Sequence, residues 1–244
     1  MQITILCCIL GSDCSWEVVV MANIIVVVDG LPSCGKTSTA KELAEMLKRR
    51  FCPLHKGMTA INSGLFYRAV GKDANDHNIR VNDIPKLIES ARGTCKRLVN
   101  LFEDEYAWEK YAETLNDEEI GTFASYVSPL YSIRQLIYQT LRGIAENTPC
   151  IVCDGQNSHE VFENAILFFL EAPLEMRALW RHKQTGGDLQ EITQAIHDRE
   201  HRDKTRGNSP LITPPEATIV TTSNFSSPKE TALYLFKECL KRIK

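Results

Sequence analysis

The stretch Ile24-Ile-Val-Val-Val-Asp-Gly-Leu-Pro-Ser-Cys-Gly-Lys-Thr-Ser-Thr-Ala-Lys-Glu42 decides the fold of this 244-residue chain. Five apolar residues with a strong preference for β-strands come directly before Asp29, as in a buried strand. A complete G-x-x-x-x-G-K-S/T motif follows from Gly30 to Thr37, and apolar residues then recur at the spacing of one helix face. A strand, a glycine-rich loop and a helix in this order predict a phosphate-binding loop, because a chance glycine turn would rarely have both flanks.

The residue types of this loop indicate which ligand it binds. Gly30 and Gly35 let the backbone turn sharply, so that successive amides and the positive end of the following helix can face phosphate oxygens. Lys36 supplies a mobile positive charge for the terminal phosphates, and the Thr37 hydroxyl is placed to bind a magnesium ion between two of them. We therefore expect ATP with Mg²⁺, bound by Gly30, Leu31, Pro32, Ser33, Cys34, Gly35, Lys36, Thr37 and Ser38.

The composition indicates one α/β domain. With 43% hydrophobic residues, a chain of this length can bury one sizeable core and still carry a small insert. The net charge is −3, and the lysines and arginines are spread along the chain. This distribution gives no sign of a nucleic acid or an anionic membrane as partner. We expect a monomer that acts on small molecules.

The nine cysteines are scattered through apolar runs without the spacing of a disulfide framework, which is typical of reduced thiols in the cytoplasm. Cys150 and Cys153 form a C-x-x-C pair, but they lie in a predicted strand, so a redox or zinc role is not expected. Cys34 is a candidate for modification without a role in the chemistry.

Residues 1–21 are predicted to be an N-terminal extension, of which residues 1–20 are not expected to belong to the natural chain. The apolar patch from Ile3 to Leu10 has no basic residue before it and is too short to cross a bilayer. Neither a signal peptide nor a membrane anchor is therefore expected. Met21 stands directly before the first strand, and we expect translation to start there rather than at Met1.

The rest of the hydrophobic pattern alternates between strands and helices, which predicts a central parallel sheet flanked by helices. Residues 102–122 fit a hairpin as well as a helix. Expected strands span 24–28, 149–153, 165–170 and 217–222, and expected helices span 36–51, 83–101, 130–146, 173–185, 189–205 and 229–241, with another helix opening at 61–64.

A second cluster of charge precedes the last strand. Arg199, Arg202, Asp203 and Arg206 fall on one helical stripe, where Asp203 can orient the arginines on either side of it. Such a stripe is often a solvated helix face joined by salt bridges. Beside a phosphate loop it also fits a mobile segment whose arginines close over a phosphoryl group during transfer.

Three further motifs are narrower than the loop alone. They are Val28-Asp29-Gly30, Asn62-Ser63-Gly64-Leu65-Phe66-Tyr67-Arg68-Ala69-Val70, and Arg199-Glu200-His201-Arg202-Asp203-Lys204-Thr205-Arg206 followed by Ser209-Pro210-Leu211. With these motifs, residues 22–240 resemble the nucleoside monophosphate kinases, and among them the bacterial-type cytidylate kinases. The resemblance implies a P-loop NTPase fold over 22–244, with a monophosphate-binding insert at 84–125 and an arginine-bearing lid at 186–208. It also implies phosphoryl transfer from ATP to CMP or dCMP.

The resemblance implies roles for residues on both sides of the transferred phosphate. On the donor side, Arg177 and Arg181 would touch the triphosphate, and Asp154 would reach the magnesium through a bound water. On the acceptor side, the monophosphate would be bound by Ser63, Tyr67, Arg68, Ser125 and Arg134. Catalysis would depend on Lys36, Arg199, Asp203 and Arg206.

The chain departs from the family pattern after the strand at 149–153. Asp154-Gly155-Gln156-Asn157 stands where the family usually has Asp-Gly-Arg-Asp, so two charges are replaced by neutral amides. Gln156 and Asn157 are still predicted to bind the acceptor, through weaker neutral hydrogen bonds. Two other interpretations therefore stay open: an ATP-binding module with weakened transfer, and a phosphate-loop kinase of another small molecule.

Overall fold

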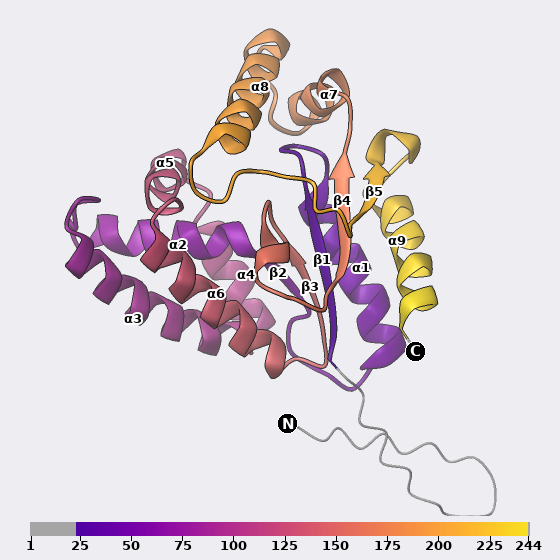
Figure 1. Ribbon diagram of the computed structural model, residues 1–244, viewed down its shortest axis with the longest axis horizontal. Helices are drawn as coiled ribbons and strands as arrows, with labels where there is room; N and C mark the ends of the chain where they lie inside the picture. The colour runs from indigo at the N-terminus through magenta and orange to yellow at the C-terminus, as the bar shows by residue number, and fades with distance from the viewer. Residues whose placement is uncertain (1–22, 244) are drawn as a thin grey trace, which may run out of the picture.

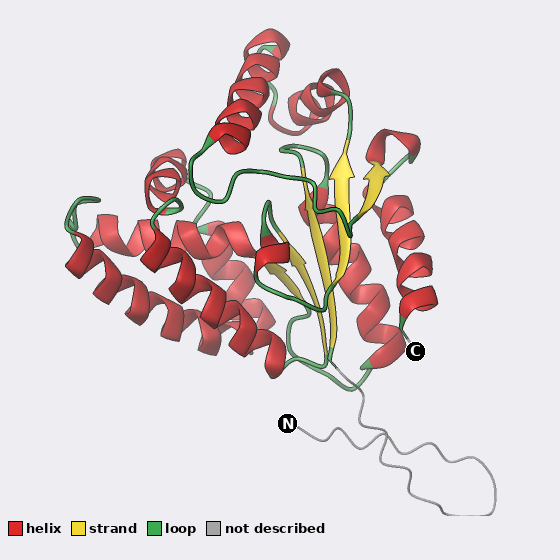
Figure 2. Cartoon of the chain, in the orientation of Figure 1, coloured by secondary structure: helices red, strands yellow, loops and turns green. Residues whose placement is uncertain are grey.

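The computed structural model describes residues 23–243, so the predicted extension at 1–21 lies outside the described residues. Within them, parallel strands form one sheet in the order β2-β3-β1-β4-β5, with helices on both faces (Figures 1 and 2). The strands are β1 (Ile24–Gly30), β2 (Ala60–Asn62), β3 (Cys150–Asp154), β4 (Ile166–Glu171) and β5 (Thr218–Thr221). The predicted α/β fold with a central parallel sheet is confirmed.

The sheet separates the hydrophobic core into two layers, each covered by helices (Figure 1). α1 (Lys36–Phe51) and α9 (Pro228–Arg242) pack on one face of the sheet, and α2 (Ser63–Asp76), α3 (Ile84–Phe102) and α6 (Tyr131–Glu146) on the other. Val26 and Val28 of β1 pack with α1 and α9, whereas Val27 packs with the helices of the opposite face. Because both faces are covered, the strand is apolar at successive positions instead of alternating.

The carboxyl edge of the sheet brings distant parts of the chain together. β1 is the central strand, and its register aligns Val28 with Asp154 of β3 and Gly30 with Leu170 of β4. Since the strands are parallel, the chain leaves β1, β3 and β4 at the same edge. α7 (Leu174–Thr185) and α8 (Leu189–Thr205) stand beyond this edge, at the top of Figure 1.

The region that fitted either a hairpin or a helix is helical. It contains α4 (Glu105–Glu113) and α5 (Glu118–Val127). Asp104 and Asp117 cap these helices by accepting hydrogen bonds from amides of the first turn. Trp108 of α4 anchors the region in the core, with its ring centroid 5.7 Å from that of Phe66 and 5.8 Å from that of Phe102. The capping aspartates were therefore a better signal than the apolar period.

Two local expectations were wrong. Residues 60–62 form the edge strand β2, where only the opening of a helix was expected, and three residues are too few to show a strand period. Pro173 caps α7 instead of being its first residue, because its ψ of 143° is extended. The boundaries of α1 and α8 match the expected 36–51 and 189–205.

The cysteines of residues 23–243 are all buried free thiols. Cys150 and Cys153 lie in β3, as expected. Cys34 is 1% exposed, its Sγ lies 2.9 Å from the carbonyl oxygen of Leu31, and burial raises the pKa of its thiol. The expectation that Cys34 is open to modification is therefore wrong. Among the helices of the described range, none combines the length and apolar character that a membrane span requires.

Candidate active site

The phosphate loop is held in shape by its contact with the end of β4. Gly30 has φ 150°, and a Cβ at this position would lie 2.1 Å from the carbonyl oxygen of Leu170. The Leu31 amide donates to that same oxygen at 3.0 Å. Gly35 has φ 82° and caps α1, so that the helix begins at Lys36. The loop thus runs directly into the positive end of a helix, where an anion is favoured.

The first two residues of α1, Lys36 and Thr37, form hydrogen bonds with the loop and with the end of β3. The Lys36 ammonium donates to the carbonyl oxygens of Gly30 (3.0 Å) and Leu31 (2.6 Å). The Thr37 hydroxyl donates to the Asp154 carboxylate at the end of β3, across 2.7 Å. Burial raises the pKa of Asp154 to about 6, opposed by the Thr37 hydrogen bond and the Lys36 charge.

The Thr37–Asp154 pair tests whether magnesium fits this site. A hydroxyl and a carboxylate are hard oxygen donors, which magnesium prefers, usually with one or two protein ligands beside phosphates and water. The Asn62 amide donates to both residues, at 3.1 Å to Thr37 and 3.0 Å to Asp154, and so holds the two oxygens together. The donor set fits Mg²⁺, with Thr37 and Asp154 as the residues that would hold it.

Three arginines from separate helices are placed so that the charges of two of them act on the third. They are Arg68 of α2, Arg181 of α7 and Arg199 of α8. Desolvation and the charges of Arg199 and Arg181 lower the pKa of Arg68. Arg68 also donates to the carbonyl oxygens of Leu115 (2.8 Å) and Asp117 (3.2 Å), between α4 and α5. Like charges brought together in this way favour an anion between them.

Arg134, a predicted acceptor ligand, is buried within a polar cluster. Its guanidinium donates to the Ser209 hydroxyl at 2.6 Å and to the Tyr138 hydroxyl, lies 3.4 Å from a Glu160 oxygen, and faces the Tyr67 ring at 5.9 Å from the centroid. Burial alone would raise the pKa of Glu160, but hydrogen bonds from Ser209 and Tyr138 and the charge of Arg134 bring it below its usual range. Glu160 thus balances the buried arginine.

Ser63 and Ser125, both predicted acceptor ligands, lie in different surroundings. Ser63 begins α2, its hydroxyl is 3.2 Å from that of Ser158, and a Cβ on Gly155 would lie 2.3 Å from its Oγ. Ser63 is therefore packed against the turn after β3. Ser125 is exposed on α5, and its hydroxyl donates to the Thr122 carbonyl within the same helix. The structure brings Ser63, but not Ser125, into hydrogen-bonding contact with that turn.

Arg177 and Arg181 of α7 lie one helical turn apart but differ in exposure and in contacts. Arg177 is buried, and its guanidinium donates to the carbonyl oxygens of Ala172 (2.9 Å) and Pro32 (3.0 Å) and to Glu200 (2.7 Å). It therefore joins the end of β4, the phosphate loop and α8. Arg181 is exposed near Arg68. Contact of either arginine with a triphosphate stays a prediction.

The stripe on α8 is arranged around Asp203, as its spacing indicated. Arg199 Nε and Arg206 Nη1 each lie 3.8 Å from an Asp203 carboxylate oxygen. The side chain of Arg199 is 61% exposed, whereas those of Asp203 and Arg206 are 16% and 19% exposed. Desolvation and the charge of Arg134 lower the pKa of Arg206, although Asp203 opposes this. The stripe is therefore more than a solvated face.

Gln156 and Asn157, predicted to bind the acceptor, contact the last turn of α8 and the segment that follows it. Gln156 donates to Asp203, and Asn157 donates to the carbonyl oxygen of Ser209 at 2.7 Å. Neither residue type carries a signal for this pairing, because the partners lie 47 and 52 positions away in the sequence.

No role was predicted from the sequence for Asp29, His159, Glu160 or Ser209. Asp29 is 1% exposed and accepts hydrogen bonds from the amides of Ser158 (2.9 Å) and His159 (3.0 Å). His159 Nδ1 is 2.8 Å from the same carboxylate. A carboxylate that ends a buried strand is a signal that could have identified Asp29. It fixes the turn that carries Gln156 and Asn157.

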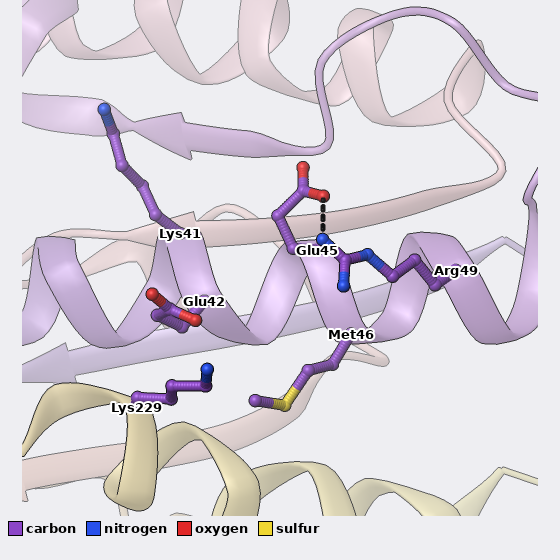
Figure 3. A pocket seen from close by; sticks show the side chains of 6 residues that line it. All are labelled: Lys41, Glu42, Glu45, Met46, Arg49 and Lys229. Carbon is purple, nitrogen blue, oxygen red and sulfur yellow. Dashed lines mark ion pairs between the residues drawn. The ribbon is translucent and has the colours of Figure 1, made fainter.

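A separate hollow lies on the outer surface of α1, where α9 passes (Figure 3). Glu45 and Arg49 form an ion pair of 3.6 Å across one helical turn there. Its mixed charges give no preference for an anion, so it is not the candidate site. The hollow is lined by Lys41, Glu42, Glu45, Met46, Arg49 and Lys229.

Comparison with known proteins assigns the family. Residues 26–232 match the family model described as cytidylate kinase. A cytidylate kinase of Chromobacterium violaceum is 32% identical over 212 residues, which cover 83% of this chain and 89% of that protein. Cytidylate kinases of Caldanaerobacter subterraneus (29% identical, 82% and 88% covered) and Brucella melitensis (30% identical, 85% and 89% covered) are also similar. The chain therefore belongs to the cytidylate kinase family.

Proposed function

We propose that this chain transfers the γ-phosphoryl group of ATP to CMP or dCMP. One observation carries the proposal: the phosphate loop follows β1, and the helices that carry Arg68, Arg181 and Arg199 follow β2 and β4 at the same carboxyl edge of the sheet, where the charges of Arg181 and Arg199 act on Arg68. A loop alone supports binding of a triphosphate. A second cluster of cations supports binding of a second anion, which a phosphoryl acceptor must be.

On the donor side, the loop amides and the start of α1 would bind the triphosphate. Lys36 would exchange the carbonyl oxygens of Gly30 and Leu31 for phosphate oxygens, and so replace neutral acceptors by charged ones. Thr37 and Asp154 would hold magnesium, which supplies neutralisation of charge on the bridged phosphates when bound. Asp154 would bind it in the ionised form.

On the acceptor side, Arg68 would bind the monophosphate. Arg181, predicted to touch the triphosphate, and Arg199, predicted to act in catalysis, would contact the phosphates from their own helices, so that anions between them and Arg68 would relieve the mutual repulsion. The acceptor phosphate is already a nucleophile, so the residues have to position it and stabilise charge, and no strong base is needed. Arg206, oriented by Asp203, would act on the transferring group. Tyr67, Ser63, Ser125 and Arg134 would surround the rest of the acceptor.

Three finer features are part of this proposal: the choice of acceptor, the oligomeric state and the location. A choice between CMP and dCMP would depend on the turn after β3, where neutral Gln156 and Asn157 replace charged residues. A monomeric state and a cytoplasmic location, expected from composition and cysteine usage, stay predictions. An ATP-binding module with weakened transfer is the second candidate, and the observation that favours it is that Gln156 and Asn157 are neutral, where the resemblance implied an arginine and an aspartate.

A coupled assay separates the candidates. The purified chain is incubated with ATP, magnesium and one of CMP, dCMP, UMP or AMP, and ADP release is followed. We expect turnover with CMP or dCMP and its loss in Lys36→Ala, whereas Lys229→Ala, which lies in the separate hollow of Figure 3, should keep full activity. ATP binding without turnover on any pyrimidine monophosphate would overturn the proposal in favour of the binding module.

A further inference from the structure

Two neutral side chains join the turn after β3 to the last turn of α8 and the segment that follows it. Gln156 donates from Nε2 to the Asp203 carboxylate. Asn157 donates from Nδ2 to the carbonyl oxygens of Ser209 (2.7 Å) and Pro210 (3.0 Å). We propose that Gln156 and Asn157 are positioning residues that tether residues 203–211, here called the lid tail, to the edge of the sheet.

The lid tail is a closed unit, so holding its two ends fixes what lies between them. The Leu211 amide donates to the Asp203 carbonyl oxygen at 2.7 Å, and Arg206 Nε donates to the Ser209 carbonyl oxygen at 2.5 Å. Gln156 holds one end and Asn157 the other. Arg206 lies between the two attachment points and is therefore positioned by them.

The chemistry of Asn157 shows why this position requires an amide. A carbonyl oxygen can only accept, so the NH₂ group of Asn157 must face Ser209 and Pro210. The other atom of the amide, Oδ1, is buried and has no hydrogen-bond partner within residues 23–243. An aspartate would place negative oxygens against these two carbonyls, and Glu160 Oε1 is only 3.4 Å from the Asn157 nitrogen. The donor function therefore determines the residue.

Gln156 is matched to Asp203 in the same way. It donates a hydrogen bond to this carboxylate without cancelling its charge. An arginine at this position would compete with Arg199 and Arg206, which lie 3.8 Å from the same group. The neutral pair thus binds the lid tail and leaves Asp203 free to orient both arginines. Gln156 and Asn157 therefore act on one contact surface.

Amide hydrogen exchange of the full chain without nucleotide tests the tether directly. We expect the amides of Arg206 and Leu211 to exchange at least tenfold faster in Asn157→Asp than in the unaltered chain, while the amides of α9 keep their protection. Asn147→Asp is the matched control, since Asn147 also donates to a backbone carbonyl, that of Gly143 at 2.8 Å, but at the far end of α6. Unchanged exchange over 203–211 in Asn157→Asp would overturn the proposal.

A second variant is needed if the amides of Asn157→Asp lose protection from exchange throughout the protein, because that variant would then report unfolding and not the tether. Gln156→Glu has the same shape but sets a carboxylate against Asp203. Its lid tail should exchange faster, while the amides of α9 keep their protection.

The catalytic consequence rests on the proposed function: kcat with CMP should fall at least tenfold, with the KM for ATP within twofold. A rise in the KM for CMP alone, with unchanged kcat and exchange, would identify Gln156 as an acceptor ligand and overturn the tether. Inactivity of the unaltered chain would contradict the proposed function only, because exchange is read without nucleotide.

Discussion

The phosphate loop and the acceptor side of the site are built in opposite ways. The loop is one contiguous segment that presents main-chain amides, and its shape follows from Gly30, Gly35 and the strand and helix beside it. The acceptor side is assembled by side chains from α2, α6, α7, α8 and the turn after β3. Arg134 meets Ser209 across 75 positions, and Asn157 meets the same residue across 52. A local motif can therefore be recognised in a sequence, whereas a distributed site becomes visible only in the fold.

The largest expected effect lies on the donor side. Lys36→Ala removes the mobile cation of the loop but leaves its backbone cradle, so ATP should still bind while transfer fails. We expect kcat to fall by about 10²–10³ or more, the loss typical of removing one charge-stabilising donor. Single-turnover assays with CMP measure this effect. Equal unfolding midpoints would show that the loop is intact, and a kcat within tenfold of the original would contradict the assigned role.

The backbone of the loop can be broken separately from its charge. Gly30→Ala places a Cβ 2.1 Å from the Leu170 carbonyl oxygen, so the free energy of unfolding should fall by about 3 kcal/mol. In Gly35→Ala the added Cβ meets open space among the described residues. Only the left-handed backbone with φ 82° disfavours the alanine, so the free energy of unfolding should fall by about 1–2 kcal/mol. Urea unfolding measures both variants. A greater loss in Gly35→Ala would show that contact with β4 does not shape the loop.

Protonation of Asp154 makes the free energy of unfolding depend on pH. Its pKa is raised from 3.8 to about 6, so the folded protein binds a proton that the unfolded chain has lost. Its contribution to the free energy of unfolding therefore decreases as the pH rises from about 4 to 6, and is constant above that window. Asp154→Asn removes this dependence, and its stability relative to the original chain should rise by about 2–3 kcal/mol between pH 4 and pH 7. Urea titrations at both values check the difference, which a pH-independent offset would refute.

The acceptor side should respond to loss of one arginine in binding more than in fold. Arg68→Ala removes one of three neighbouring cations, and we expect the KM for CMP to rise about tenfold or more, as for loss of one charged hydrogen bond. The KM for ATP should stay within twofold. Steady-state kinetics with each substrate varied in turn provide the measurement. Equal changes in both KM values would mean that the two sides are not separate.

The same contrast explains what could be predicted from the sequence. The loop, α1 and α8 follow from local patterns, and the structure confirms the expected bounds of both helices. Strand β2 is too short to have a period, and the aspartates that cap α4 and α5 were overlooked in an acidic, aromatic segment. Asp29 has a local signature, a carboxylate at the end of a buried strand, whereas Glu160 and Ser209 have none, because each derives its role from partners distant in the sequence. Gln156 and Asn157 were expected to bind the acceptor, and their hydrogen bonds to the lid tail depend on the fold.

The central claim is that the loop and the arginine cluster are two halves of one transfer site. The most direct measurement is the affinity, in the presence of magnesium, of a single ligand in which adenosine and cytidine are joined by five phosphates. If the two halves face each other across one phosphate chain, this ligand should bind at least about 100-fold more tightly than ATP. Lys36→Ala and Arg68→Ala should each weaken it. Binding no tighter than that of ATP alone would contradict the account.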